Sequence, residues 1–274
     1  MGIIKGLDHQ EYLQVAGVSN SMLNALMRSP AHLKHYIENG SKEPTYSMQF
    51  GTALHMALLE PSKFQERYIA IPENMDLRTK EGKQFKEACE FGMLTILKNE
   101  DYKAIQSIQE KCRNHSTIPA LLKNVESEIS LFWEDGETKI PCKGRCDGWV
   151  ETEELKLIID IKTTTNARVG AFEKSIFKYG YHRQGALYLD GAKALGKDFR
   201  HYLIIAIENE PPYNLAVYRL LDEIVELGRK EVKKLLAQYD ECLKANEWAG
   251  YPEGVQDIAI PSWALNKLEE EYYE

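Results

Sequence analysis

The chain has 274 residues, of which 43% are hydrophobic and 28% charged, and its formal net charge is −8 at pH 7. This length and composition are ordinary for a soluble globular protein with a sizeable core. The negative charge argues against non-specific coating of nucleic acid through overall charge, although it leaves room for a locally basic groove. We find no internal repeat or linker, so a single domain over residues 1–274 is expected.

Targeting and cysteine patterns point to a cytoplasmic protein with free thiols. The sequence has no run of about 18 apolar residues, so we expect no contact with a membrane. Residues 1–6 lack a basic-then-apolar signal segment, which predicts a cytoplasmic location. The five cysteines form no CxxC pair, and neither a disulfide framework nor an iron–sulfur cluster is expected.

The first part of the chain, residues 1–125, is predicted to be mainly helical. Ser19 or Asn20 can cap one helix, and Pro30 fits the first turn of the next. Capping residues and apolar segments predict helices over residues 19–27, 30–38, 48–59 and 79–114, the last with a break near residues 99–101.

The second part, residues 126–274, is predicted to carry the sheet. Strand-like segments bounded by turn residues occur at residues 127–133, 139–150, 155–163, 201–208 and 213–220. Helices are predicted over residues 167–178, 181–195 and 222–248. The expected fold is therefore α/β, with a mixed central sheet flanked by helices and an N-terminal helical cap.

Residues 155–164, LKLIIDIKTT, carry the strongest chemical signal. Alternate residues of a strand share a face, so Asp160 and Lys162 would lie together, opposite the apolar face that contains Ile159 and Ile161. A strand this apolar is expected to be central. Charges in such a partly buried place are costly unless they are paired or bind a metal. The same acid-to-lysine spacing elsewhere in the chain lies in polar or helical surroundings, where a solvated pair is expected.

The preceding predicted strand, KIPCKGRCDGWV, would place Asp147 on one face and small residues, Gly148 among them, on the other. If the two strands form a hairpin, Asp147 can lie beside Asp160. Two adjacent carboxylates repel each other, raise each other's pKa and need a cation, and their hard oxygen donors suit Mg²⁺ or Mn²⁺. On these residues alone, a metal-free salt bridge between Asp147 and Lys162 remains an alternative.

Two predicted helices contribute weaker candidates. Gln184 and Tyr188 are four residues apart and share a helix face, with Arg183 adding positive charge nearby. His55 is a lone histidine in the apolar sequence GTALHMALLEP. Taken alone, the first pair is typical of a helix surface and the histidine is typical of a hydrogen-bonded core residue.

Together, GRCDGW, the DIK motif and QGALY resemble the PD-(D/E)xK nuclease superfamily. Asp160 of DIK follows Asp147 by thirteen positions. The segments GTALHMALLEP and VSNSMLNALMRSPAHLKHY further resemble the RecE (exonuclease VIII) branch and related phage exonucleases. The similarity covers roughly residues 18–189 in the correct order, and it implies the restriction-endonuclease-like fold.

The resemblance also implies a metal site for Mg²⁺ or Mn²⁺. Its implied ligands are His55, Asp147, Asp160 and the backbone carbonyl of Ile161. Glu128, in the first predicted strand, matches an acid found in relatives and is a candidate for a supporting position or a second metal.

The remaining motif residues are implied in catalysis or in DNA contact. Lys162 would be the catalytic lysine, and Gln184 and Tyr188 would be the helix pair that supports the active-site face. The residues expected near DNA are Arg28, Thr163 and Arg183.

The activity implied by the resemblance is a 5′→3′ exonuclease on double-stranded DNA ends that leaves 3′ single-stranded tails for recombination. No GxxxxGK[ST] sequence is present, so the activity is expected to be independent of ATP. A homo-oligomeric ring and a single-strand annealing recombinase partner are expected by the same resemblance. The alternatives are a structure-specific or single-strand nuclease of the same fold and a non-catalytic DNA-end binding protein. The intact set of Asp147, Asp160 and Lys162 disfavours the binding protein.

Overall fold

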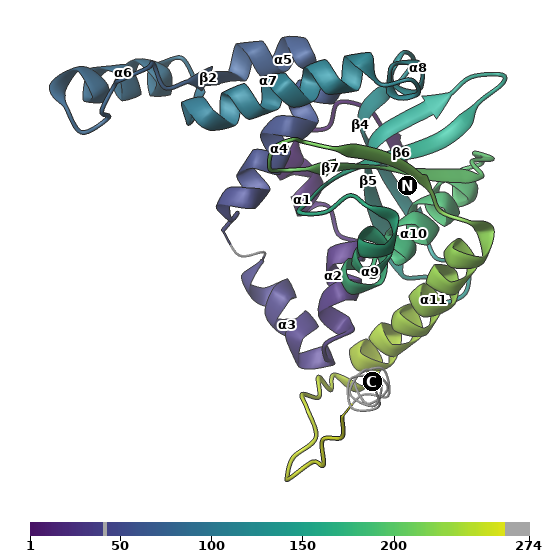
Figure 1. The fold of residues 1–274 in the computed structure, drawn as a ribbon. Helices are drawn as coiled ribbons and strands as arrows, with labels where there is room; N and C mark the ends of the chain where they lie inside the picture. The colour runs from purple at the N-terminus through teal and green to yellow at the C-terminus, as the bar shows by residue number, and fades with distance from the viewer. Residues whose placement is uncertain (41–42, 261–274) are drawn as a thin grey trace, which may run out of the picture.

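The computed structural model of the chain describes residues 1–40 and 43–260, and its centre is a six-stranded sheet with the order β1-β4-β5-β6-β7-β8 (Figure 1). The pair β6 and β7 is parallel, and the other neighbours are antiparallel. The mixed sheet expected from the sequence is confirmed. Its strands are β1 (Gly2–Ile4), β4 (Glu126–Glu134), β5 (Pro141–Glu151), β6 (Lys156–Thr164), β7 (His201–Glu208) and β8 (Leu215–Arg219).

Helices cover both faces of this sheet (Figure 1). One face packs against α2 (Asn20–Leu26), α3 (Pro30–Asn39), α9 (Val169–Tyr179), α10 (Tyr181–Ala194) and α11 (Asp222–Ala245). The other face packs against α4 (Tyr46–Leu59), α5 (Pro61–Arg67), α7 (Asn99–Asn114) and α8 (Ile118–Leu122). A further short helix, α1 (His9–Gln14), follows β1.

Two hydrophobic cores result, one on each side of the sheet. The α10-side core includes Leu131, Cys146, Ile158, Ala186 and Tyr202. The α4-side core includes Leu54, Ile108, Val150, Ile159 and Ile161. Strand β6 supplies apolar side chains to both cores, which agrees with its predicted central position. Because both of its faces are buried, apolar residues occur on both faces of the strand.

The two helices predicted over residues 79–114 are present as α6 (Lys80–Phe91) and α7, but the break between them lies earlier than predicted. Helix α6 ends well before residue 99, and a small parallel sheet of β2 (Tyr68–Ala70) and β3 (Thr95–Leu97) lies beside it. The N–H of Gly92 bonds to the carbonyl of Ala88, and Met93 has a left-handed φ of 55°. The helix therefore stops there, so the break predicted near residues 99–101 was placed too late. Figure 1 shows α6 projecting from the body of the molecule.

In the described ranges, none of the helices is both long and apolar enough to cross a membrane.

Close packing of α10 on β4 gives a prediction for Gly191. A Cβ added there would lie 2.8 Å from ring atoms of the buried Trp133. We expect Gly191→Ala to lower the free energy of unfolding by about 1–3 kcal/mol, because the added methyl overpacks the core. Gly170, in α9, is the matched control, since in the described part of the chain a Cβ there meets no atom within 4 Å. Gly170→Ala should be neutral or stabilising by up to about 1 kcal/mol. Urea unfolding measures both, and equal effects would contradict the packing argument.

Candidate active site

The two candidate carboxylates lie where β5 separates from β6. The strands pair from Glu151 opposite Lys156 as far as Gly148 opposite Ile159, and the described register ends there. Continued by one step, that register would place Asp147 opposite Asp160. Strand β6 meanwhile stays paired with β7 from Leu157 to its last residue, Thr164. We call the place where β5 separates from β6 the fork. The site lies there, and β6 is held in place by its pairing with β7.

An irregularity in β5 turns Asp147 toward this fork. Cys146 packs in the α10-side core and Val150 in the α4-side core, so the alternation of β5 shifts by one residue between them. A Cβ on Gly148 would lie 3.1 Å from the Cβ of Ile159, which places Gly148 on the α4 side. The prediction that Gly148 shares a face with Cys146 was therefore wrong. Across from Asp147 in β4, Glu128 has a left-handed φ of 56°, so the distortion spans both strands.

At the fork, the side chain of Asp147 replaces the missing backbone hydrogen bonds between β5 and β6. Its Oδ2 accepts a hydrogen bond of 2.9 Å from the backbone N–H of Ile161 and lies 3.4 Å from Nδ1 of His55 on α4. The N–H and C=O of one strand residue point to the same side, so the carbonyl of Ile161 is also directed toward Asp147. Three of the expected metal donors are thus gathered on one side of β6.

Asp160 is almost completely enclosed, with 1% of its surface exposed. Its Oδ1 accepts a hydrogen bond of 2.8 Å from Nε2 of Gln184 on α10. Its Oδ2 lies 2.7 Å from Nζ of Lys162, yet this buried oxygen has no hydrogen bond of regular geometry. The contact is therefore mainly a charge interaction, and Oδ2 can still coordinate a further cation.

The charges at the fork shift one another's titration. Burial raises the pKa of Asp147 to about 6, and the negative charges of Asp160 and Glu128 add to this effect. Burial alone would lower the pKa of Lys162, but the carboxylates of Asp160 and Asp147 outweigh it and raise that pKa above its ordinary value. Near neutral pH, Lys162 is therefore an ammonium group beside carboxylates that repel each other.

These residues fit a divalent metal ion. The donors are the carboxylates of Asp147 and Asp160, the imidazole of His55 and the carbonyl of Ile161, a mainly oxygen set that suits Mg²⁺ or Mn²⁺. Oδ2 of Asp160, which has no hydrogen-bond partner among the described residues, is a buried oxygen that such an ion could coordinate. Within residues 1–40 and 43–260, no three His, Cys, Asp or Glu side chains already stand in metal-binding geometry, so binding would require small side-chain movements.

Helix α10 supports this face of the site through consecutive turns. Gln184 donates to Asp160, while its predicted role in supporting the active-site face remains a prediction. Tyr188, one turn further, is buried against Gly144, where an added Cβ would lie 2.7 Å from its ring, and it meets Tyr202 edge-on at 6.4 Å. Tyr188 therefore fixes the distance between helix and sheet, while Gln184 contacts a carboxylate directly.

Glu128 lies next to the fork and is bound by Arg145. The two side chains form an ion pair, and Nη1 of Arg145 also donates to the carbonyl of Leu7, 2.8 Å away. This pairing orients Glu128 beside Asp147, whose pKa it helps to raise. A role for Glu128 toward a metal remains a prediction.

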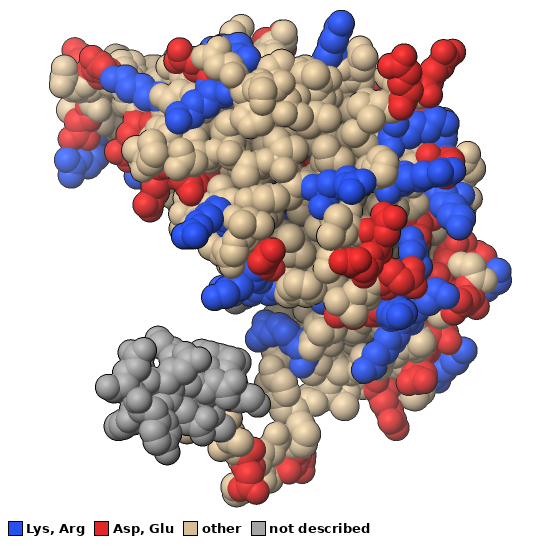
Figure 2. Space-filling view, turned by 45° about the vertical axis from the view of Figure 1, so that its right-hand side comes forward, with Lys and Arg blue, Asp and Glu red and all other residues tan. Residues whose placement is uncertain are grey.

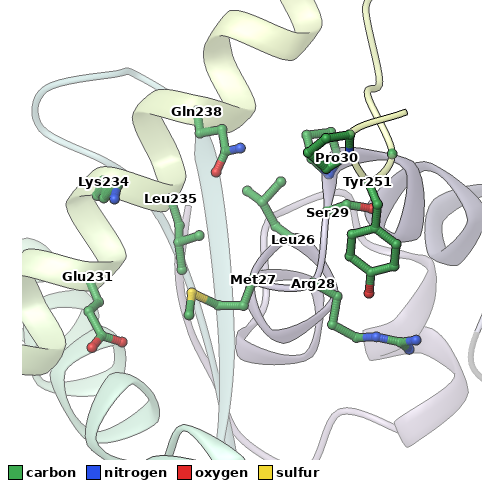
Figure 3. A pocket seen from close by; sticks show the side chains of 12 residues that line it. Leu26, Met27, Arg28, Ser29, Pro30, Glu231, Lys234, Leu235, Gln238 and Tyr251 are labelled. Carbon is green, nitrogen blue, oxygen red and sulfur yellow. The ribbon is translucent and has the colours of Figure 1, made fainter. Parts of the chain in front are cut away.

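Arg28 is placed apart from the carboxylates. It is exposed and lines a cavity of about 540 Å³ between the start of α3, α11 and residues 250–252. Figure 3 shows Arg28 and Tyr251 on one side of this cavity, with Glu231 and Leu235 of α11 on the other. The cavity shares no lining residue with the fork, so the structure does not bring Arg28 together with Asp147, Asp160 and Lys162.

Thr163 and Arg183, which were also expected near DNA, have different surroundings. Thr163 is half-buried on the α4 side, where a Cβ on Gly51 would lie 3.9 Å from its hydroxyl. Arg183 is only 5% exposed, and its guanidinium donates to Glu231 at 2.7 Å and to Asn24 at 2.8 Å. This placement argues against a DNA contact for Arg183, because contact would require its buried guanidinium to leave Glu231 and Asn24.

Sequence reasoning missed Tyr181, the first residue of α10. Its ring centroid lies 4.8 Å from Nζ of Lys162. A signal was available, because Tyr181 precedes Gln184 by three positions and residues at that spacing share a helix face. The first turn of α10 thus contacts both members of the Asp160–Lys162 pair.

Residues 19–259 match a family described as a PDDEXK-like domain of unknown function, DUF3799. The chain belongs to this family. The match covers most of the chain and includes every residue of the fork, so the expected membership of the PD-(D/E)xK superfamily is confirmed. A search among curated proteins finds no significant match.

Two solved structures of exonucleases are similar to this chain to different degrees. A presumed exonuclease from Eubacterium rectale superimposes with a TM-score of 0.58 at 12% identity, over 90% of this chain and 96% of that one. At this identity the likeness shows a shared fold. A phage-related exonuclease from Haemophilus somnus 129PT aligns over 85% of this chain and 97% of that one at 14% identity, with a TM-score of 0.37 that is too low to carry an argument.

The raised pKa of Asp147 predicts how stability without metal depends on pH. The folded value of about 6 lies above the ordinary 3.8, so the folded protein holds a proton that the unfolded chain releases. The resulting stabilisation is complete below about pH 4 and is lost as the pH rises through about 6. In EDTA we expect the free energy of unfolding of Asp147→Asn to equal that of wild type near pH 4. Near pH 8 we expect it to be higher than that of wild type by about 1–3 kcal/mol.

Urea unfolding at both pH values measures this difference. Asp257→Asn is the control, because Asp257 lies at the surface and its replacement should leave stability unchanged at both pH values. A difference between wild type and Asp147→Asn that does not change with pH would contradict the burial argument.

Proposed function

We propose that the protein is a divalent-metal-dependent DNA exonuclease that degrades double-stranded ends in the 5′→3′ direction. The observation that carries the nuclease assignment is the gathering of Asp147, Asp160 and Lys162 at the fork between β5 and β6, within a PDDEXK-like domain. A protein that only binds DNA has no need for buried carboxylates that repel both each other and phosphate.

In this proposal, each side chain of the fork has a part in phosphodiester hydrolysis. A bound divalent metal ion would supply a water of lowered pKa and a polarised phosphate oxygen. Asp147 and Asp160 would hold that ion, and Gln184 orients the carboxylate of Asp160 through its 2.8 Å hydrogen bond. Lys162 is held as an ammonium group by its raised pKa, so it orients the attacking water and neutralises charge that develops on the phosphate.

The finer parts of the proposal rest on resemblance. The RecE-like motifs support action on double-stranded ends, 5′→3′ polarity and 3′ single-stranded tails for recombination. They also support a homo-oligomeric ring and a single-strand annealing recombinase as partner. Figure 2 shows Lys and Arg side chains scattered among acidic ones over one face of the molecule. A ring would concentrate cations from several subunits in one channel, which reconciles DNA binding with a net charge of −8.

End-labelled duplex DNA tests this function directly. With Mg²⁺ we expect release of the 5′ label before the 3′ label and no cutting of a closed circular duplex, whereas EDTA stops the reaction. Asp160→Asn should be inactive, and Lys162→Ala should lose about 10²–10⁴-fold in rate, the usual effect of removing one such group. Faster digestion of single strands than of duplex would instead favour a single-strand nuclease, and cutting at internal branches would favour a structure-specific one. The absence of any Mg²⁺-dependent product would leave the DNA-end binding protein.

The position of His55 beside Asp147 gives a separate prediction about metal binding. We expect Mn²⁺ to raise the melting temperature of wild type, because a ligand that binds only the folded state stabilises it. His55→Ala should show a smaller rise, since an imidazole donor is lost. The control is His35→Ala on the exposed surface of α3, which should keep the full rise. An undiminished rise in His55→Ala would show that His55 is not a ligand.

A further inference from the structure

A series of cations and aromatic rings leads away from Lys162 along the turn between α9 and α10. Nζ of Lys162 lies 4.8 Å from the ring centroid of Tyr181. The ring of Tyr181 lies 5.7 Å from that of Tyr179, and Nζ of Lys178 lies 5.1 Å from the Tyr179 ring. Two rings bracketed by two cations are therefore continuous with the candidate active site.

The two rings have different surroundings. Tyr181 is half-buried and packs 6.2 Å from Phe172, so its ring forms part of the wall beside Lys162. Tyr179 is 48% exposed, although burying an aromatic ring of this size would be favourable. The outer ring therefore offers open aromatic surface beside a lysine.

The turn that carries Tyr179 is fixed in place. Gly180 has a left-handed φ of 71°, and a Cβ there would lie 2.2 Å from the guanidinium of Arg183. The side-chain amide of Asn24 donates to the carbonyl of Tyr179 at 3.2 Å, and Arg183 in turn donates to Asn24. Arg183 is also paired with Glu231, so a partly buried network holds the backbone that carries the exposed ring. A backbone held in this way needs no further ordering when the ring binds a ligand.

We propose that Tyr179 and Lys178 form a subsite that stacks the base of an unpaired nucleotide in the strand being cut, next to the phosphate at Lys162. Rings interleaved with lysines are the chemistry that recognises single-stranded nucleic acid, because bases stack on the rings and phosphates meet the cations. A base inside a duplex has both faces covered, so only an unpaired nucleotide can use this ring. The inference rests on the proposed nuclease function and adds a contact with the separated strand.

The test compares two single-stranded probes in EDTA, which prevents cutting. One is a thymidine oligonucleotide and the other is an abasic oligonucleotide of equal length, both measured by fluorescence anisotropy. We expect wild type to bind the thymidine probe roughly tenfold more tightly than the abasic probe, in the range of one stacked base. Tyr179→Ala should lose this preference by weakening only the thymidine probe, and Tyr179→Phe should keep it.

Two further variants separate the contributions of ring and charge. Lys178→Ala should weaken both probes equally and reduce the dependence of affinity on salt by about one phosphate contact. Phe91→Ala removes a 93% exposed ring on α6, away from the fork, and should bind both probes like wild type.

Failure of the subsite and failure of the proposed function give different results. If Tyr179→Ala weakens both probes equally, or keeps the preference for thymidine, the stacking subsite is overturned while Mg²⁺-dependent digestion by wild type still supports the nuclease. If wild type shows no preference between the probes, the exposed ring serves another partner, such as a protein, and the subsite is likewise overturned. If wild type digests no DNA at all, the proposed function fails and the inference fails with it.

Discussion

The carboxylate of Asp160 in the middle of a central strand is the constraint on which the rest of the site depends. With 1% of its surface exposed, it would be strongly destabilising without partners. Gln184 satisfies one oxygen and Lys162, on the same strand, faces the other, and the Gln184 contact requires the first turn of α10 to lie beside β6. The placement of α10, and of the turn before it, is thus tied to one buried charge.

The fork between β5 and β6 leaves backbone groups of β6 free to contact side chains of the site. Full pairing would use the N–H and carbonyl of Ile161 in the ladder and would place Asp147 flat against Asp160. The shift in alternation near Gly148 instead lets the Asp147 side chain bind that N–H and approach His55 of α4. Groups from both helical layers therefore meet at one opening in the sheet, which neither layer could form alone.

Helix α10 connects this opening to the surface. Its first turn places Tyr181 against Lys162 and Gln184 against Asp160, and its next turn packs Tyr188 on the sheet. Arg183, on the other side of the same helix, binds α11 and α2 and so fixes the turn that carries Tyr179. The same helix thus orients the buried charges and holds the exposed ring proposed to bind a base.

Local patterns in the sequence determined the strands β4 to β8, the central position of β6 and the shared face of Asp160 and Lys162, because alternation within a strand depends only on neighbouring residues. The short edge strand β1 was not predicted. The motif spacing likewise identified Asp147 as the partner across the hairpin. Only the tertiary structure decided that β5 shifts its alternation at Gly148, since that depends on β4 and β6 together. It also decided that Arg183 turns inward, because the Glu231 that pairs with it lies 48 residues away on α11. From the sequence alone, Arg183 could contact DNA, because the helix that carries its partner is distant in the chain and is brought close only by tertiary packing.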